Sequence, residues 1–436
     1  MSVISSVRDC PNCSRSIDSD PRFSDWCQSC DWNLGPDKQL SGRAASRRAR
    51  DLARVEQLYG RLVEQPAGSR WSVARCAALG LATVVHLATL AVAGGSLWLL
   101  VEGYPLLKVV GALGLGLTYL LRPRLGRWRA ESGVVDRERA PQLYALVDRI
   151  ADELGTRRPD RIKVSTDFQA SYVHLGVRRR VQLTLGLPLW TVLTPEERVA
   201  LLGHELGHGV NGDERRGFWL SLAADTLEAW QRLLVPTSGD LYMLRVNQRG
   251  RARTVRGART QKTALDEFAN WLLQVVALPV RGAHRLLHRL TRAGSQRAEY
   301  LADELAAGIG SSQAAASMLG KLYLRESVMA RLRQQRAGGP SGGGARGAEA
   351  EEGLWTGLRD YLDSIPPSEL ERRSRLSART MTSIDASHPP THLRVRLRAE
   401  RPEQPAAVVL DAAEWAVIDT ELGDLRRAAA RALLGH

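Results

Sequence analysis

The distribution of hydrophobic and polar residues predicts helices that can cross a membrane in the first third of this chain. Residues 76–101, CAALGLATVVHLATLAVAGGSLWLLV, contain no Asp, Glu, Lys or Arg. About 20 apolar residues suffice for a helix to cross a bilayer core. After the break EGYP, residues 106–121 form a second, shorter apolar run, and Lys108 lies near enough to its start to reach the interface. The alternative for either run is a helix buried in a protein core.

From about Val134 the pattern becomes that of a water-soluble domain. APQLYALVDRIADELG has apolar residues at helical spacing, and RIKVS, ASYVHLG and RRVQLTLGL predict short strands. Residues 218–235 are too polar to form a membrane span, and residues 268–280 are too short. We expect both to be amphipathic helices that pack on the domain or lie at the membrane surface. AGGPSGGGARGAEAEEG, residues 337–353, predicts a flexible insertion.

A strong helix start precedes the most informative motif, LTPEERVALLGHELGHGVNGD. Thr194 is suited to the N-cap, Pro195 to the first helical position, and Glu197 follows three residues after the cap. The helix should run to about Gly209 or Gly212. His204 and His208 would then lie one turn apart on one face, so both imidazoles can reach one metal ion.

The downstream sequence supplies candidates for a third ligand. In SQRAEYLADELAAG, Ser295 is suited to an N-cap, and Glu299 and Asp303 again lie one helical turn apart. One carboxylate can bind the metal while the other holds a ligating histidine from behind. HRLLH, with His284 and His288, has the same histidine spacing but an Arg in place of the glutamate, and nothing nearby supplies a third ligand. We interpret it as a solvated or interfacial basic face.

The charge and the length of the chain limit its organisation. With 436 residues it can form two or three structural units. Its net charge of +14 favours anionic partners only weakly, because the basic residues are mostly Arg, as GC-rich coding also produces. RRAR precedes the first apolar run and RPRLGRWR follows the second, while the turn between them carries only Glu102. The positive-inside rule therefore places both flanks in the cytoplasm.

The cysteines predict a second metal site. CPNC and CQSC place Cys10, Cys13, Cys27 and Cys30 as two knuckles thirteen residues apart, and Cys76 stands alone in the apolar run. This spacing is typical of a zinc ribbon with four thiolate ligands, which is structural because no coordination position stays open. We call residues 1–38 the cysteine module. It has few basic residues, so we expect a docking or regulatory role, with a possible protein partner, and not nucleic-acid binding.

Three motifs together, GHELGH, RAEYLAD and SHPPTHLRV, resemble those of the HtpX-like family of integral-membrane zinc metalloproteases, which are related to CAAX prenyl proteases. The resemblance covers about residues 73–400. It implies zinc ligands at His204, His208 and Glu299, and a general base at Glu205. It also implies that Asp303 supports a ligand from behind.

The resemblance reaches further residues less directly. His388 lies where relatives place a histidine near the substrate carbonyl, and Arg394 follows in the same stretch. The alternative for these two is a structural Pro-Pro turn with a surface Arg. Relatives carry an NAFA-like edge strand that pairs with the substrate backbone. Here the stretch is SYVH, with Ser171, Tyr172 and Val173 as the corresponding substrate-binding residues, so the Asn contact is lost. Two further spans that relatives often have are too polar here, and the cysteine module is an addition.

The expected architecture is therefore α+β and mostly helical. We expect a zinc ribbon (1–38), a basic helical linker (39–72), a two-helix transmembrane hairpin (73–121) and a zincin-like catalytic domain (130–336). The insertion (337–353) and the C-terminal part of the catalytic domain (354–436) follow. Both termini and the active site should face the cytoplasm at the cell membrane.

The expected function is that of a zinc metalloendopeptidase acting on polypeptides, in the quality control of membrane or misfolded proteins. Two zinc ions are expected, one catalytic and one structural. Glu205 would act as general base and acid, and His388 would stabilise the oxyanion. The alternative is a non-catalytic membrane adaptor that binds protein partners through the zinc ribbon and the zincin-like domain. An adaptor, however, has no need of Glu205.

Overall fold

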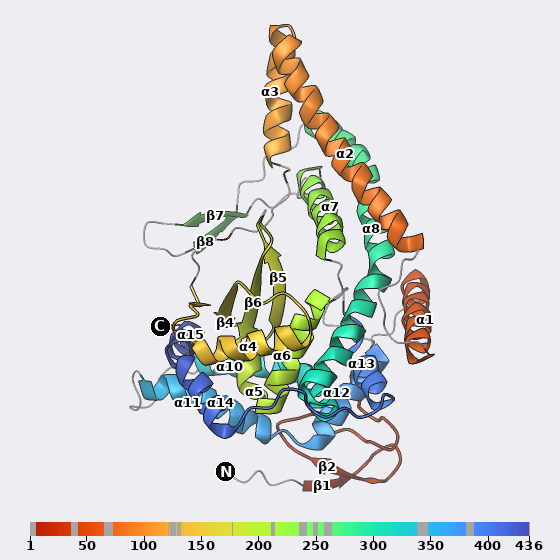
Figure 1. The fold of residues 1–436 in the computed structure, drawn as a ribbon. Coiled ribbons are helices and arrows are strands. Elements are labelled where there is room, and N and C mark those ends of the chain that lie inside the picture. The colour runs from red at the N-terminus through yellow and green to blue at the C-terminus, as the bar shows by residue number, and fades with distance from the viewer. Residues whose placement is uncertain are drawn as a thin grey trace. The chain divides into compact units, whose positions relative to one another are not determined.

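The computed structural model describes residues 6–35, 42–64, 73–120, 122, 128, 132–176, 178–210, 214–234, 242–246, 252–256, 264–337, 348–380 and 388–435. These residues divide into two compact units (Figure 1). The first unit comprises residues 1–69, 126–212 and 295–436, and the second comprises residues 70–125 and 213–294. The described residues are mostly helical with small sheets, in agreement with the α+β prediction.

A four-stranded mixed sheet organises the first unit. Its order is β3-β4-β6-β5, with β3 (Val134–Val135), β4 (Arg161–Ser165), β5 (Ala170–Leu175) and β6 (Arg180–Gly186). β4 runs parallel to β6, and β5 runs antiparallel to it. In β6 every residue from Val181 to Gly186 is buried, whereas β5 is only half-buried. The predicted strands are thus confirmed, and β5 forms one edge of the sheet.

Helices surround this sheet and supply most of the core. They are α1 (Gly42–Glu64), α4 (Pro141–Glu153), α5 (Leu187–Val192), α6 (Pro195–Val210), α9 (Ser312–Lys321), η1 (Leu322–Leu324), α10 (Arg325–Ala337), α11 (Ala348–Asp363), α12 (Pro367–Thr380), α13 (Thr391–Ala399), α14 (Ala412–Glu421) and α15 (Gly423–Leu434). Leu143, Ile162 and Leu183 are fully buried between α4 and the strands. Burial of each such side chain contributes about 1.5–3 kcal/mol.

The start of α6 confirms the predicted capping. Glu197 Oε2 accepts a hydrogen bond from the backbone N–H of Thr194 at 2.7 Å, and the Glu197 backbone N–H donates to Thr194 Oγ1 at 3.4 Å. The Glu197 carboxylate also binds Lys321 Nζ at 2.6 Å and Ser317 Oγ at 2.6 Å, both on α9. The capping box therefore fixes α6 to a neighbouring helix as well as beginning it.

The cysteine module belongs to the first unit and has little regular structure. β1 (Ser6–Asp9) and β2 (Ser16–Ser19) form a two-stranded antiparallel sheet. Each Cys-x-x-Cys knuckle closes in the same way: Ser14 N–H donates to the Cys10 carbonyl, and Asp31 N–H donates to the Cys27 carbonyl, both at 2.9 Å. Ser14 and Asp31 both have positive φ, 56° and 57°.

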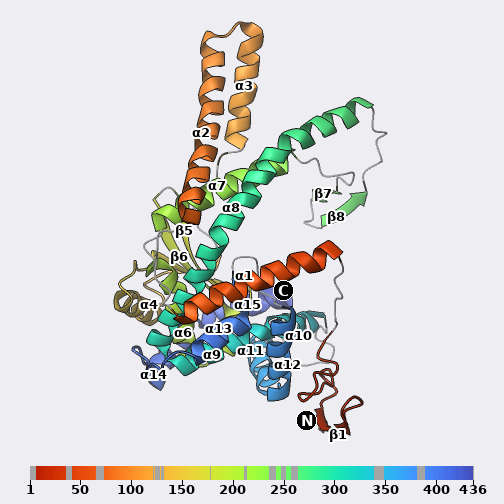
Figure 2. The same cartoon turned by 90° about the vertical axis from the view of Figure 1, so that its right-hand side faces the viewer.

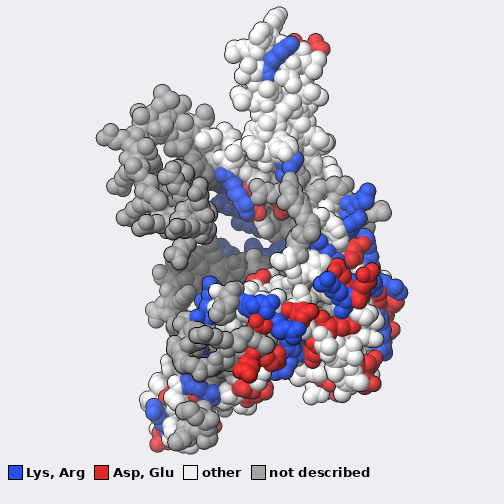
Figure 3. Space-filling model, turned by 90° about the vertical axis from the view of Figure 1, so that its left-hand side faces the viewer, with Lys and Arg blue, Asp and Glu red and all other residues white. Residues whose placement is uncertain are grey.

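The second unit contains the apolar helices. α2 (Val73–Glu102) has 30 residues and is long and apolar enough to cross a membrane; α3 (Pro105–Leu120) is apolar but has only 16 residues. The two pack closely, because a Cβ on Gly111 of α3 would lie 2.6 Å from the Ser96 carbonyl oxygen of α2. Charged side chains are almost absent from the face of these helices in Figure 3. Among the described residues, α2 is the one candidate span, and the two-span hairpin stays a proposal.

The rest of the second unit consists of α7 (Glu214–Leu234), the β7–β8 hairpin (Tyr242–Val246 and Ala252–Arg256) and the N-terminal part of α8 (Ala264–Gly310). Residues 218–234 of the first predicted helix lie in α7, with residue 235 outside the described residues, and the predicted helix at residues 268–280 lies in α8. Ala82 of α2, Leu227 of α7 and Val280 of α8 share one apolar cluster, and α7 packs against α2. Both segments therefore contribute to the apolar cluster that includes the helix able to span a membrane.

Two sequence expectations were wrong in their boundaries. Ser295 is not an N-cap, because α8 is helical from Ala264 to Gly310 and its residues on both sides of Ser295 already belong to the helix. The predicted insertion is too long: residues 338–347 lie outside the described residues, but α11 begins at Ala348. The segment AEAEEG consists almost entirely of good helix formers, which explains the early start.

Candidate metal centre

Small residues bring the two ligand-bearing helices of the first unit close together. On α6, a Cβ on Gly203 would lie 2.9 Å from the Ile309 side chain, and one on Gly207 would lie 3.3 Å from the Ala302 Cα. On α8, a Cβ on Gly310 would lie 2.5 Å from the Ala200 backbone N. Larger side chains would separate α6 from α8. The glycines of GHELGH therefore set the distance between the histidines and Glu299.

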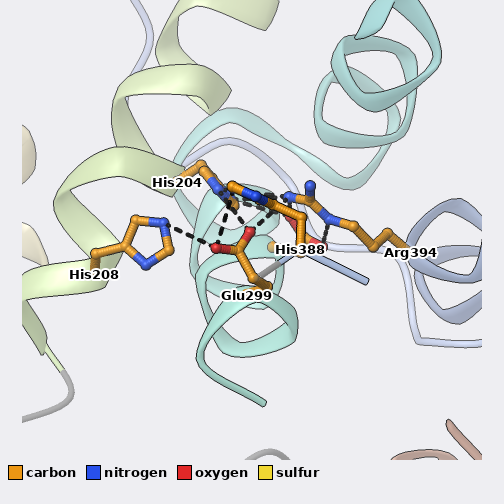
Figure 4. Close-up of polar contacts among 6 residues, drawn as sticks. His204, His208, Glu299, His388 and Arg394 are labelled. Atoms are coloured by element: carbon orange, nitrogen blue, oxygen red, sulfur yellow. Dashed lines mark hydrogen bonds and ion pairs between the residues drawn. The ribbon is translucent and has the colours of Figure 1, made fainter. Parts of the chain in front are cut away.

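Among the described residues, His204, His208 and Glu299 form one of two groups that could hold a metal ion. Their ligand-type atoms all lie within 4.8 Å of one another. His204 Nε2 is 3.6 Å from Glu299 Oε2, and His208 Nε2 is 3.8 Å from Glu299 Oε1 (Figure 4). His204 and Glu299 are buried, and His208 is half-buried.

The donors fit a divalent cation such as zinc. Glu299 Oε2 is buried and accepts no hydrogen bond, and Arg394 Nη2 lies 3.6 Å from it, beyond hydrogen-bond distance. A buried carboxylate oxygen without a hydrogen bond is costly, and a bound cation or solvent would lower that cost. Burial lowers the pKa of His204, and burial followed by the charge of Arg394 lowers the pKa of His208 to about 4. Both imidazoles are therefore neutral at physiological pH, as metal ligation requires.

Two buried side chains, Asp303 and Arg394, orient His204. Asp303 Oδ1 lies 3.0 Å from His204 Nδ1, which leaves Nε2 facing Glu299. Arg394 in turn binds Asp303 through two hydrogen bonds, Nε to Oδ2 at 2.7 Å and Nη2 to Oδ1 at 2.6 Å. Burial alone would raise the pKa of Asp303, but Arg394 holds it far below its usual value. Asp303 is thus an ionised carboxylate, as expected for a residue that holds a ligand.

Arg394 lies elsewhere than the sequence suggested, which was either a substrate-binding position or the protein surface. Its side chain is only 2% exposed, so it is not a surface Arg, and its guanidinium is bound to Asp303 and not free for substrate. Burial would lower its pKa, but Asp303 raises it above the usual value, so it stays charged. The structure therefore places Arg394 behind the ligands. A guanidinium is the group that suits a buried, bidentate carboxylate pair.

Glu205 lies beside the ligand group and is itself buried. Burial, followed by the charge of Glu299, raises its pKa to about 8, while Arg394 and a hydrogen bond from the Tyr172 backbone act in the opposite direction. A general base works best when its pKa lies near the operating pH. The Tyr172 contact was not foreseen from the sequence, because it depends on how β5 packs on α6.

The remaining predicted residues lie around this centre. His388 is half-buried, and its Nε2 is 3.4 Å from Glu299 Oε1, so it is near the ligands without joining their group (Figure 4). Ser171, Tyr172 and Val173 lie on the edge strand β5, and Val173 is exposed. The Tyr172 hydroxyl donates to the Arg157 carbonyl at 3.2 Å. The structure thus gathers Glu205, His388 and the edge strand around one ligand group.

The cysteines form the second group that could hold a metal. The four Sγ atoms, of Cys10, Cys13, Cys27 and Cys30, lie within 4.8 Å of one another, and none is in a disulfide. Four convergent thiols are the donor set of a structural zinc ribbon. By contrast, His284 Nε2 and His288 Nε2 lie 3.1 Å apart but belong to no such group among the described residues.

Comparison with known proteins agrees with this geometry. A model of peptidase family M48 matches residues 137–401, which include the histidines of α6, Glu299, Asp303, His388 and Arg394. A protein named Protease HtpX homolog, from Moorella thermoacetica, is 31% identical over 117 residues, or 27% of this chain and 39% of that relative. This chain thus matches less than half of the relative's length. No solved structure matches the chain.

Proposed function

The chain belongs to peptidase family M48, and on this premise we propose that it is a membrane-anchored zinc endopeptidase. The observation that carries the proposal is the convergence of two neutral imidazoles and one buried carboxylate with an unsatisfied oxygen, beside a second carboxylate that can act as base. Two histidines and a glutamate are a donor set of catalytic zinc sites, which keep a position open for water.

The residues around this position divide the work of hydrolysis. When bound to His204, His208 and Glu299, zinc supplies a Lewis acid that activates water and polarises the scissile carbonyl. Glu205 accepts the proton of the attacking water and returns it to the leaving amine nitrogen. His388 donates a hydrogen bond to the oxygen that becomes negative in the transition state.

The substrate reaches these residues as an extended chain. β5 forms the edge of the sheet, and its Tyr172 backbone contacts Glu205. An extended peptide that adds to this edge would present its backbone to the base, and main-chain hydrogen bonds tolerate many side chains. Such broad recognition suits unfolded segments. We therefore propose misfolded or membrane proteins as the substrate class, in agreement with the HtpX-like resemblance.

The anchor is the helix pair of the second unit. α2 meets the length and hydropathy of a membrane span. α3 has 16 residues, fewer than the about 20 that a helix needs to cross a bilayer core, but it packs closely against α2. We propose that both cross the membrane as a hairpin, because the Arg-rich segments that flank them favour the cytoplasm on both sides.

The test is cleavage of an unfolded protein, such as reduced casein, by the full chain purified in mild detergent. We expect zinc-dependent cleavage that a chelator abolishes and added zinc restores. Glu205→Gln should lower turnover by orders of magnitude and leave the fold unchanged. A matched control is Glu196→Gln, which changes a glutamate in the first turn of the same helix, outside the ligand group. If the wild type binds unfolded protein without cleaving it, and the Glu205→Gln variant binds it equally well, the adaptor alternative is correct.

A further inference from the structure

The cysteine module lies against α12 of its own unit. Arg375 Nη1 donates to the Gln28 carbonyl oxygen at 2.6 Å and to Asp31 Oδ1 at 2.9 Å. Arg372 Nη1 donates to the Leu34 carbonyl oxygen at 2.9 Å. A Cβ on Gly35 would lie 2.7 Å from the Leu376 side chain. The second knuckle and the end of the cysteine module are thus held by one face of α12.

Other contacts extend this interface beyond α12. Arg22 donates to the Ser364 hydroxyl and to its carbonyl oxygen, both at 2.8 Å. Phe23 packs against the main hydrophobic core of the unit. The guanidinium of Arg375 lies 5.3 Å from the Trp26 ring centroid, within the range of a cation–π interaction. The interface therefore combines charged hydrogen bonds with apolar packing.

α12 is tied to the peptidase body from its other side. The Glu369 carboxylate is 2% exposed and accepts from Arg372 at 2.6 Å and from Arg373 at 2.7 Å. Arg373 also donates to the Tyr323 carbonyl oxygen at 3.0 Å and to Ser327 Oγ at 2.6 Å. One buried carboxylate thus connects the arginine that reaches the cysteine module with the arginine that reaches η1 and α10.

α12 also contacts the helix that carries Arg394. α12 packs against α13, and Arg394 on α13 holds Asp303 behind His204. A continuous set of packed elements therefore leads from the cysteine module to the support of a metal ligand. Such continuity permits coupling, and only a measurement can establish it.

The cysteine module has too small a core to fold without a metal. Its strands have four residues each, and its described buried apolar residues are Cys10, Ile17, Trp26, Cys27 and Leu34. Modules of this kind take most of their folding free energy from metal binding. Gln28 and Asp31, which bind Arg375, belong to the knuckle that begins at Cys27. Their positions therefore depend on the metal that the four thiolates hold.

We propose that the metal-loaded cysteine module is an intramolecular clamp on α12, so that its metal occupancy determines how firmly α12 and α13 are held behind the active site. The face of the module that contains Gln28, Asp31 and Leu34 is then occupied by this chain and is not a docking site for another protein. The effect on peptide cleavage rests on the proposed function, but the clamp itself does not.

The clamp is tested by amide hydrogen exchange in the full chain carrying Glu205→Gln, which removes self-cleavage. We expect Cys27→Ser to lose the module's metal and to increase exchange in α12 about tenfold or more, since charged hydrogen bonds are lost. Arg372→Ala with Arg375→Ala should accelerate α12 exchange similarly while the module keeps its metal. This double variant also decides the matter if Cys27→Ser fails to fold.

Matched controls separate the clamp from general damage. Cys76→Ser removes a cysteine of α2, and Arg15→Ala removes an arginine that donates to Ser29 Oγ within the module. Both should leave α12 exchange unchanged. Unchanged α12 exchange after the module has lost its metal would overturn the proposal and show that the module is independent.

A second readout uses the chain with Glu205 intact. The double arginine variant should lower kcat several-fold. KM should change little, because the edge strand β5 is untouched. Replacing Arg375 by Lys in place of Ala should recover part of the lost kcat. If the wild type proves inactive, the proposed function fails, while the exchange experiment still decides whether the clamp exists. If exchange in α12 rises but kcat does not fall, the clamp is real but uncoupled from the site.

Discussion

At the scale of single residues, the two glutamates of the metal centre should separate ligand from base. Glu205→Gln keeps both imidazoles and Glu299, so the catalytic zinc should stay bound while turnover falls by orders of magnitude. Glu299→Ala removes the only anionic donor of the group, so catalytic zinc and activity should both be lost. Zinc content is measured by mass spectrometry and compared with the ion held by the cysteine module. Full zinc and activity in Glu299→Ala would place the third ligand elsewhere.

The buried pair of Asp303 and Arg394 should matter more for stability than its sequence interpretation suggested. Asp303→Asn keeps the shape but weakens the orientation of His204, so zinc affinity or activity should fall about 10–100-fold. Arg394→Met leaves an unpaired buried carboxylate and should cost about 3–5 kcal/mol of stability. Thermal unfolding measures this cost. Arg427→Met, which removes an exposed arginine paired within α15, should change the Tm little.

The sequence suggested the candidate ligands and a supporting role for Asp303, but not the position of Arg394. The pairs His204 with His208 and Glu299 with Asp303 could be found because side chains one turn apart share a helix face, and the family resemblance selected Glu299 as the third ligand. Arg394 could not be placed, because its partner Asp303 is 91 residues away and its burial depends on α13 packing beside α8. The same holds for Lys321, whose bond to Glu197 fixes α6. Long-range pairs of this kind leave no local pattern.

At the scale of elements, the close approach of α6 and α8 should be sensitive to size. Gly203→Val should push α6 away from Ile309 and Ala306, which costs about 1–3 kcal/mol and separates the histidines from Glu299. Activity should fall more steeply than the Tm. Gly353→Ala is the control, because nothing lies within 4 Å of the added Cβ on α11. It should be neutral or slightly stabilising. Equal effects of the two changes would contradict the role of Gly203.

The basic helix α1 also contributes to the site, which its predicted role as a linker did not include. It lies against α13 (Figure 2), and its Leu58 and Leu62 share an apolar cluster with Tyr300, the neighbour of Glu299. Tyr59 Oη donates to Glu400 Oε2 at 2.7 Å. α1 thus packs on the two helices that carry Glu299 and Arg394.

Adjacent positions of α1 offer a matched test of that packing. Leu62 is 4% exposed and Val63 is 39% exposed. Leu62→Ala should cost about 2–5 kcal/mol and reduce activity, whereas Val63→Ala should be nearly silent. Denaturant unfolding and casein cleavage measure the two effects. Similar stabilities of the two variants would show that α1 is a linker only, as its charge pattern first indicated.

The element boundaries that the sequence missed have a common cause. Ser295 has the residue type of an N-cap, but helix on both sides leaves it no free backbone N–H groups to accept from. Propensity is local, whereas α8 is also stabilised by tertiary packing, such as the cluster around Leu287 and the close approach of Gly310 to Ala200 of α6. The strands β4, β5 and β6 were placed correctly, because alternation and flanking turn residues define short strands more sharply.

At the scale of the whole molecule, the distribution of arginine predicts the topology. RRAR precedes α2 and RPRLGRWR follows α3, whereas the turn between the helices carries only Glu102. If both helices cross the bilayer, the cysteine module and the peptidase domain lie on the same side, the cytoplasm. A single span through α2 alone would place them on opposite sides. The intramolecular clamp on α12 requires the same side, so topology tests both ideas.

Reporter fusions after Lys38 and after Arg129 decide between these topologies. Two spans predict that a cytoplasmic reporter is active at both positions and a reporter that requires export at neither. Replacing Lys108 by Leu should leave the result unchanged, because the flanking arginines set the orientation. Activity of the exported reporter after Arg129 would mean that α3, at 16 residues, stays on one side of the membrane. The peptidase domain would then face outward, and the cysteine module could not be bound to α12 in the inserted protein.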